Sequence, residues 1–181
     1  MKLVGDQIYL RLYKTSDARD LASLQTRNRE FFQRVSPLLP EAFYTEEYQK
    51  VRLQQALKKT DEGQLYPFGI FLKANDKLIG DISLTQITRG DLQSCYTGFT
   101  LDKEYNGKGY TTEALQLVVD FAFKELKLHR IEAGAMPDNI ASIRVLEKAG
   151  FQKEGIAKEN LKVNGKWTDH QILAIISSLD V

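Results

Sequence analysis

The sequence predicts a mixed α/β protein, and three observations support this fold class. Segments that alternate apolar and polar residues, as strands do, are interleaved with segments whose apolar residues recur every three to four positions, as in helices. The predicted order is strand, two helices, three antiparallel strands, helix, strand, helix and two strands, which is neither a doubly wound sheet nor a barrel. No repeat or Pro/Gly-rich linker interrupts the chain, so we expect a single domain over residues 1–181.

The first third of the chain predicts one strand and two helices. Residues 7–13 alternate and indicate a strand. Ser16 is expected to cap the following helix. Pro37 and Pro40 then break the chain, and a second helix is expected over roughly residues 45–59.

Three antiparallel strands are predicted next. Residues 68–73 and 78–84 are strand-like and flank an Asn75-Asp76 turn, which indicates a hairpin. The third strand is expected over residues 94–101. Gly98 inside it predicts a β-bulge or a close backbone approach.

The last part of the chain predicts two helices and three strands. One helix is expected from about residue 110, followed by a buried strand over residues 130–136. Asp138 or Asn139 is expected to cap the next helix. The two final strands meet at Asn164-Gly165, a strong hairpin turn.

Composition excludes several classes of protein. The chain has 25 Lys and Arg against 24 Asp and Glu, so charge gives no case for non-specific binding to nucleic acid or membranes. No apolar run reaches membrane-spanning length, and no signal peptide is evident. The single cysteine, Cys95, forms no internal disulfide and is expected in the core. We expect a cytoplasmic protein without a metal site, since no ligand cluster has metal-binding spacing.

A loop with two glycines, followed by a helix, is the most informative segment. Gly107 and Gly109 let backbone N–H groups approach a ligand closely, and the helix start directs its free N–H groups to the same place. A nucleotide P-loop is excluded because Gly109, rather than Ser or Thr, follows Lys108. A dinucleotide fingerprint is excluded because Thr112 stands where its third glycine belongs. A phosphate-binding loop of another kind remains, and from the residues of the loop alone a plain turn and helix cap is an equal alternative.

This loop, the order of elements and the segment around Asn139 resemble the Gcn5-related N-acetyltransferases (GNAT). The resemblance is sharpest to the RimJ/RimL-type ribosomal-protein-alanine acetyltransferases, RimJ more than RimL. It covers nearly the whole chain and is densest after residue 89. The segments that carry it are Arg89-Gly90, Cys95–Phe99, Gly107–Gly109, Glu113-Ala114, His129–Ile131, Met136–Asn139, Ser142, Gly150–Gly155 and Gly165–His170. Glu104 departs from the family, which usually has Gln or Arg there, and we expect it to point to solvent.

The resemblance implies a mostly antiparallel, twisted sheet with helices on both faces and acetyl-CoA as cosubstrate. It implies that a splayed strand end pairs with the pantetheine arm through its backbone, and that a bulge near Gly98 aims one N–H at the thioester carbonyl. The cofactor-binding residues expected on this basis are Phe99, Thr100, Leu101, Asn106, Gly107, Lys108, Gly109, Tyr110, Thr111, Asn139 and Ser142.

Asn139 and Ser142 lie one helical turn apart, so both can face the thioester. By resemblance, the Asn139 amide binds pantetheine and Ser142 protonates or stabilises the leaving thiolate. From spacing alone, Asn139 can equally be a helix cap and Ser142 a small packing residue.

The general base is less clearly indicated. Glu30, on the substrate-side helix, is the candidate, with Asp81 and Glu132 as alternatives; each can equally be a solvated or paired carboxylate. Tyr96 occupies a strand position where many relatives carry Glu. Since an N-terminal α-amine has a pKa near 8, an ordered water could suffice.

The acceptor groove is expected between Asn28, Arg29 and Phe32 on one side and Asp169 on the other. His170 could close that side too, but a structural role is the one expected of it. The expected acceptor is the N-terminal amine of a ribosomal protein beginning with alanine or serine. A small-amine acetyltransferase acting on a polyamine, an amino sugar or an amino-acid-like compound stays open. So does a non-catalytic acyl-CoA-binding, ribosome-associated protein. The chain is expected to be a monomer or a homodimer.

Overall fold

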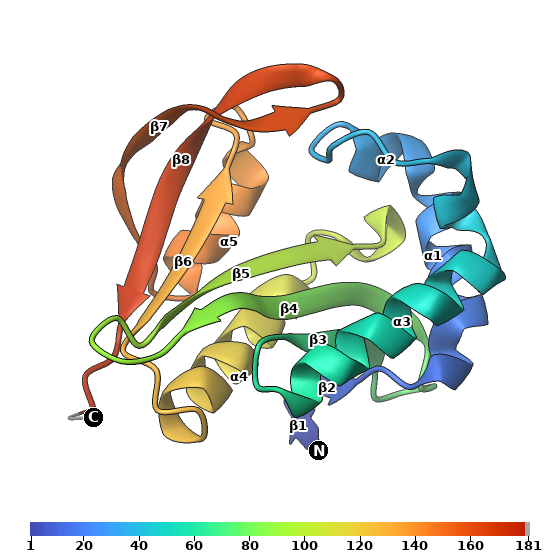
Figure 1. Cartoon of the computed structure of the whole chain (residues 1–181), viewed down its shortest axis with the longest axis horizontal. Coiled ribbons are helices and arrows are strands. Elements are labelled where there is room, and N and C mark those ends of the chain that lie inside the picture. The colour runs from blue at the N-terminus through green and yellow to red at the C-terminus, as the bar shows by residue number, and fades with distance from the viewer. Residues whose placement is uncertain (180–181) are drawn as a thin grey trace.

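The computed structural model describes residues 1–179, which form an eight-stranded sheet in the order β1-β2-β3-β4-β5-β6-β8-β7 (Figure 1). The strands are β1 (Lys2–Val4), β2 (Ile8–Leu12), β3 (Tyr66–Leu72), β4 (Leu78–Thr88), β5 (Ser94–Leu101), β6 (Arg130–Ala135), β7 (Gln152–Val163) and β8 (Lys166–Ile176). The helices are α1 (Ala18–Arg27), α2 (Arg29–Gln33), α3 (Glu46–Asp61), α4 (Tyr110–Lys124) and α5 (Ile140–Lys148), with short 3-10 turns at η1 (Thr15–Asp17), η2 (Glu41–Tyr44) and η3 (Lys103–Tyr105). Within residues 1–179, only the β5–β6 pair is parallel.

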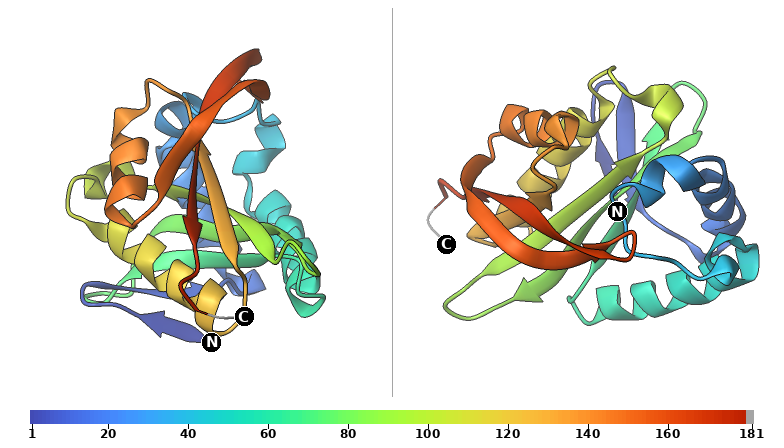
Figure 2. Two further views of the ribbon diagram at one scale, coloured as in Figure 1. Left: turned by 90° about the vertical axis from the view of Figure 1, so that its left-hand side faces the viewer. Right: turned by 90° about the horizontal axis from the view of Figure 1, so that it is seen from above.

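Helices cover both faces of the sheet, as Figures 1 and 2 show. Helices α4 and α5 lie on one face, and α1 and α3 lie on the other. Strand β4 shows how the two-residue alternation achieves this. Its Ile82 and Leu84 are fully buried in the apolar core with α4, while Asp81 and Ser83 face α3 across a cavity. The expected mixed α/β fold is confirmed.

Two apolar clusters hold these layers. The larger one lies between the sheet and α4, with Phe68, Leu115 and Val118 fully buried. A smaller one, which includes Leu21 and Leu53, packs α1 and α3 on the opposite face. Among residues 1–179, no helix is both long and apolar enough to cross a membrane.

The predicted elements all occur, and β1 and the short α2 are additional. Ser16 does not cap α1, so that prediction was wrong. The carboxylate of Asp17 accepts from the Lys14 N–H at 2.7 Å and from Arg11 at 2.7 Å. These bonds form a 3-10 turn over residues 15–17, and α1 starts only after it.

The bulge predicted near Gly98 was also wrong. Gly98 lies opposite Ser83 in regular register. The irregularity is instead in β4, between Thr85 and Thr88, where Gln86 has a φ of 51°. The sheet therefore bends one strand away from the expected place.

Strands β5 and β6 separate after a short parallel contact. Only Ser94–Tyr96 of β5 pairs with β6, opposite Arg130–Glu132. Beyond Glu132, β6 continues with β8, while β5 continues with β4. The carboxyl end of β5 therefore has an open edge, as the sequence led us to expect, and the sheet forms a V at this point (Figure 1).

Candidate active site

A cavity of about 190 Å³ occupies the V between β5 and β6. Asn139 and Ser142 reach it from α5 on one face of the sheet, and Val35 reaches it from the α2–η2 connection on the other side. A ligand in this opening is therefore accessible from both faces. Its lining residues are Val35, Thr97, Gly98, Phe99, Gly134, Ala135, Met136, Asn139, Ser142 and His170. The structure thus brings together Phe99, Asn139 and Ser142, which the sequence predicted.

The open edge of β5 offers backbone groups to an extended ligand. Successive residues of a strand point their N–H and C=O groups to opposite sides. The Asp102 N–H bonds to Ile79 in β4 at 2.8 Å, so the backbone groups of Phe99 and Leu101 point away from β4 and into the V. Thr100 differs from them: its Oγ1 is buried without a hydrogen-bond partner among residues 1–179.

The predicted phosphate loop has the required backbone conformation. Gly107 and Gly109 have φ values of 78° and 81°, in the region that favours glycine, and no atom lies within 4 Å of where their β-carbons would be. Gly109 caps α4, whose first internal bond is donated by the Glu113 N–H to the Gly109 carbonyl. The preceding N–H groups, including those of Tyr110 and Thr111, are therefore free of helix bonds. This cradle fits a pyrophosphate.

Side chains around the loop are compatible with an anion. Lys108 is exposed, and its Nζ lies 5.4 Å from the centre of the Tyr105 ring. Asn106 is exposed as well. Glu104, the residue that departs from the family pattern, is also exposed, as we expected. The backbone can therefore bind phosphate without a carboxylate being held against it.

Asn139 and Ser142 serve the helix and the cavity at once. The Asn139 Oδ1 accepts the Ser142 N–H at 3.3 Å, so the predicted helix cap is present. Both side chains also line the cavity, where Ser142 is partly exposed. The structural and the functional interpretation are therefore compatible.

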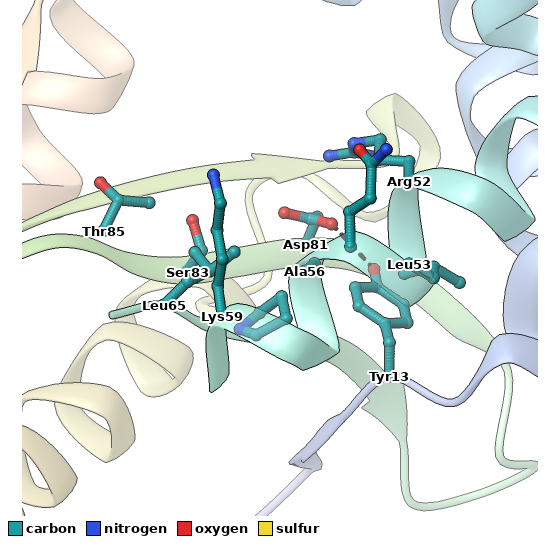
Figure 3. A pocket seen from close by; sticks show the side chains of 11 residues that line it. Tyr13, Arg52, Leu53, Ala56, Lys59, Leu65, Asp81, Ser83 and Thr85 are labelled. Carbon is teal, nitrogen blue, oxygen red and sulfur yellow. Dashed lines mark hydrogen bonds between the residues drawn. The ribbon is translucent and has the colours of Figure 1, made fainter. Parts of the chain in front are cut away.

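A second cavity, of about 260 Å³, lies between α3 and strands β3 and β4 (Figure 3). Tyr13 donates a hydrogen bond to Asp81 at 2.9 Å on its floor, and Arg52 and Lys59 form its α3 wall. Burial raises the pKa of Asp81, opposed in part by Arg52 and by the Tyr13 bond. Burial and the charge of Asp81 raise the pKa of Tyr13 well above its usual value, so its hydroxyl remains a donor.

The two cavities meet across one pair of strands. Ser83 lines the second cavity and lies directly opposite Gly98, which lines the first. Paired strands are about 4.8 Å apart, so the two cavities border neighbouring strands of the sheet.

The residues predicted for the acceptor groove line neither cavity. Asn28 is 1% exposed; its amide donates to the Leu24 carbonyl at 3.0 Å and accepts the Lys103 N–H at 3.0 Å. Arg29 pairs with Glu41 on the surface at 2.6 Å, and Phe32 is buried in the smaller apolar cluster. Asp169 accepts from Lys158 at 3.0 Å and from the Glu159 N–H at 2.9 Å.

The candidate bases also separate. Glu30 is exposed on α2, outside both cavities, and Glu132 pairs with Arg130 at 2.9 Å. Asp81 alone of the three lines a cavity. Cys95 is buried in the core as expected, and burial raises the pKa of its thiol to about 12.

Sequence reasoning missed the α3 wall of the second cavity, and it expected a structural role for His170, which lines the first cavity. Arg52 and Lys59 lie seven residues apart on one helix, a spacing that puts both on one face, but nothing in the sequence relates that face to β4. His170 lies in a predicted strand, two residues after Thr168, and nothing in this local sequence indicates a cavity.

Comparison with known proteins identifies the family. The model of the acetyltransferase (GNAT) domain matches residues 7–152. The chain belongs to the GNAT acetyltransferases. A probable N-acetyltransferase of Bacillus subtilis, YjcK, is 52% identical to this GNAT chain over 178 residues, 98% of each protein. The [ribosomal protein uS5]-alanine N-acetyltransferase of Escherichia coli is 31% identical, covering 97% of this chain and 90% of that one.

Solved structures agree with this membership. The ribosomal-protein-S5-alanine acetyltransferase of Vibrio fischeri superimposes with a TM-score of 0.94 at 36% identity, covering 98% of this chain and 97% of that one. The GNAT family uses acetyl-CoA, and so does this N-acetyltransferase. The loop at residues 106–111 fits the pyrophosphate of acetyl-CoA. The free edge of β5 fits the pantetheine arm, which in GNAT proteins carries the acetyl thioester. Among residues 1–179, no group of three His, Cys, Asp or Glu residues is arranged to hold a metal ion.

Proposed function

We propose that this GNAT chain acts as one domain that acetylates the N-terminal α-amine of a ribosomal protein, with alanine or serine as the first residue, in the cytoplasm. The observation that carries the proposal is the cavity in the V, which is lined from both faces of the sheet. The cosubstrate arm can enter from the α4–α5 face, and an amine can meet it from the α1–α3 face. The two relatives that act on ribosomal protein S5 support this choice of acceptor.

The residues around the V have distinct parts in this reaction. The N–H groups of Phe99 and Leu101 are the candidate donors to the pantetheine arm and to the negative charge that develops on the thioester oxygen. The Ser142 hydroxyl is the candidate proton source for the departing sulfur. The acceptor chain would continue from the V over Ser83 into the second cavity.

The charges in the second cavity favour a peptide acceptor over a polyamine. Arg52 and Lys59 are two positive charges against one carboxylate, Asp81. A ligand with several ammonium groups would be repelled there, whereas a neutral or acidic peptide segment would not.

A small amine with a single charge is the second candidate. Asp81 can pair with one ammonium group, and Arg52 can pair with a carboxylate, so an amino-acid-like compound also suits the second cavity. The non-catalytic alternative predicts acetyl-CoA binding without turnover of any amine.

Intact-mass analysis of ribosomal proteins tests the proposal. Ribosomal proteins from cells that lack the gene are incubated with the protein and acetyl-CoA, and a Ser142→Ala, Asn139→Ala double variant serves as the control. We expect one added acetyl group at the N-terminus of one ribosomal protein, slowed in the variant. No mass shift from a sample that binds acetyl-CoA would overturn the ribosomal acceptor. A parallel panel of amino acids, amino sugars and polyamines then identifies the alternative.

A further inference from the structure

We propose that His170 is the catalytic base, whose Nε2 takes the proton from the acceptor amine inside the V. The inference rests on the proposed N-acetyltransferase reaction. It adds to that reaction a residue for which the sequence predicted a structural role. Four observations support it: burial, position in the cavity, the tautomer of the ring and the absence of a competing base on the cavity wall.

His170 lies on β8 and is 6% exposed, with its side chain on the wall of the 190 Å³ cavity. Ser142, from α5, lines the same cavity. The other lining residues carry apolar, amide or hydroxyl side chains. Within the described part of the chain, His170 is therefore the only lining residue of this cavity with an imidazole, carboxylate or amine side chain.

The hydrogen bond of the ring determines which nitrogen is free. Nδ1 of His170 lies 3.4 Å from the carbonyl oxygen of Thr168. A carbonyl only accepts, so Nδ1 must carry the proton in this bond. In the neutral ring, Nε2 then has a lone pair, which is the tautomer that a general base requires. Among residues 1–179, the hydrogen bond that this ring makes is at Nδ1.

Gly134 leaves room on the reactive side of the ring. It also lines the cavity, and a β-carbon at this position would lie 3.8 Å from Cδ2 of His170, the ring atom bonded to Nε2. Without a side chain at Gly134, the Cδ2–Nε2 edge of the ring is uncovered on the side of β6. An acceptor nitrogen can approach it there.

Among residues 1–179, the hydrogen-bond partner of this imidazole is the Thr168 carbonyl, and the neighbouring Asp169 carboxylate acts on the ring only through its charge. Gly134 of β6, Ser142 of α5 and Val35 of the α2–η2 connection share the cavity with it, and Ala157 of β7 lies opposite it in the sheet. The adjacent Asp169 is held by Lys158 and by the Glu159 N–H. The Thr168 carbonyl therefore orients the ring, in place of the acidic residue that fills this role in many enzymes.

The proton balance of the reaction is complete with this assignment. The acceptor ammonium gives one proton to Nε2, and the imidazolium later releases it to water. The nitrogen lone pair forms the C–N bond, and the electrons of the C–S bond leave with sulfur. The second proton lost from nitrogen reaches the sulfur through the Ser142 hydroxyl, so the products are the amide, the free thiol and one proton.

Two substitutions separate catalysis from structure. In His170→Asn, the amide nitrogen takes the place of Nδ1 and can still donate to the Thr168 carbonyl, while Nε2 is removed. His129→Asn is the matched control, because His129 is the only other histidine and is exposed outside both cavities. Both variants are assayed with ribosomal proteins and with the panel of small amines, so that any acetylated acceptor reports on His170.

We expect His170→Asn to lower kcat about 100-fold, the range of general base catalysis, while the affinity for acetyl-CoA stays within about twofold. The defect should shrink as pH rises toward the α-amine pKa near 8, because more of the amine is then already neutral. A purely structural role would lower the rate by the same factor at every pH. An unchanged kcat, or a pH-independent loss, would overturn the proposal.

Nitrogen-15 NMR of the imidazole gives a readout that needs no acceptor. We expect the neutral ring to carry its proton on Nδ1, with the two histidine signals assigned through His129→Asn. A proton on Nε2 would overturn the inference even if the ribosomal acceptor is correct. Conversely, a proton on Nδ1 with no turnover of any amine would count against the proposed function and leave the tautomer supported.

Discussion

The two sides of the active site are built by different means. The cofactor side consists of the open edge of β5, the loop at residues 106–109 and the start of α4, and it offers mostly backbone groups. The proposed acceptor side lies between α3 and β3–β4, and it offers side chains such as Tyr13, Asp81 and Arg52. These side chains come from segments nearly 70 residues apart.

This difference separates what a family shares from what distinguishes its members. A site made of backbone tolerates changes of side chain and needs only glycines and strand geometry. A site made of side chains changes its specificity with each substitution. The cofactor side accordingly carries the common chemistry of GNAT proteins, and the acceptor side carries the specificity of this one.

Besides the paired strands β4 and β5, side chains at the end of α1 also connect the two sides. Nε of Arg27, at the end of α1, lies 2.6 Å from the carboxylate of Asp102, directly after β5. Asn28 accepts the Lys103 N–H beside it. The residue predicted to bind the acceptor therefore joins the acceptor side to the cofactor side instead.

The largest expected effect concerns Ser142, the side chain near the thioester to which we give a chemical role. Ser142→Ala should lower kcat about 100-fold, because the departing sulfur loses its proton source. Its affinity for acetyl-CoA should change less than about twofold, because backbone groups hold the arm. Steady-state kinetics and calorimetry measure the two quantities. Ser142→Thr keeps a hydroxyl and should keep most of the rate. Equal losses of kcat in the two variants would contradict the role of the hydroxyl as proton source.

The connection between the sides should have the next largest effect, on stability. Arg27→Ala leaves the 1% exposed Asp102 carboxylate without its cation and should cost about 2 kcal/mol, less than a fully buried pair because Arg27 is partly exposed. Denaturant unfolding measures it. Lys124→Ala, which removes an exposed pair with Asp120, should cost under about 0.5 kcal/mol.

The pH dependence of this difference has a defined sign. Burial works to raise the pKa of Asp102, but hydrogen bonds from Arg27 and the Glu104 N–H outweigh it and lower the pKa. A lowered pKa stabilises the folded protein above the unfolded-state value near 3.9, and this stability is lost as pH falls through the folded-state value. The difference in the free energy of unfolding between wild type and Arg27→Ala should therefore become smaller below about pH 4. A gap independent of pH would contradict the ion pair.

Backbone conformation on the cofactor side should have a smaller effect on binding. Gly109→Val places a branched side chain at a φ of 81°, a strain of about 1–2 kcal/mol, so acetyl-CoA affinity should fall about tenfold as the loop relaxes. Gly90→Val carries similar strain at a φ of 70° in a turn before β5 and should leave affinity unchanged. Calorimetry compares them, and equal affinities would show that the loop geometry is dispensable.

The smallest expected effect sharpens the comparison on the acceptor side. Tyr13→Phe removes the donor to Asp81 and should raise the acceptor KM about five-fold, near 1 kcal/mol, with acetyl-CoA binding unchanged. Tyr9→Phe removes a similar hydrogen bond, to Asp76 at 2.8 Å, outside both cavities, and should not change KM. Acceptor saturation curves for both variants provide the measurement.

The sequence predicted the cofactor side far better than the acceptor side, for a physical reason. Gly107, Gly109 and Asn139 act through backbone conformation and helix starts, which are local and leave a pattern of spacings. Asn28 and Arg29 were assigned to the groove from their place on a helix, but the tertiary contacts that bury the Asn28 amide have no local signature.

Strand register explains the other misses. Gly98 indicated a bulge, yet its partner strand absorbs the irregularity at Gln86, which no local rule identifies. The cavity at Asp81 exists only because α3 packs over β4. Such facts depend on how distant segments pair, which one sequence does not specify residue by residue.

The β7–β8 hairpin reaches across the V to the α2–η2 connection (Figures 1 and 2). At its tip, the Asn164 N–H donates to the Ser36 carbonyl at 2.9 Å, and Leu38 lies against Gly165. Most of β7 is exposed, whereas Ile82 and Leu84 of β4 are fully buried. Local opening of the β7–β8 hairpin therefore needs far less free energy than global unfolding. The Asn164 amide should exchange its hydrogen sooner than the amides of β4. In the proposed reaction, an acceptor chain would then enter and leave while the thioester side keeps its shape.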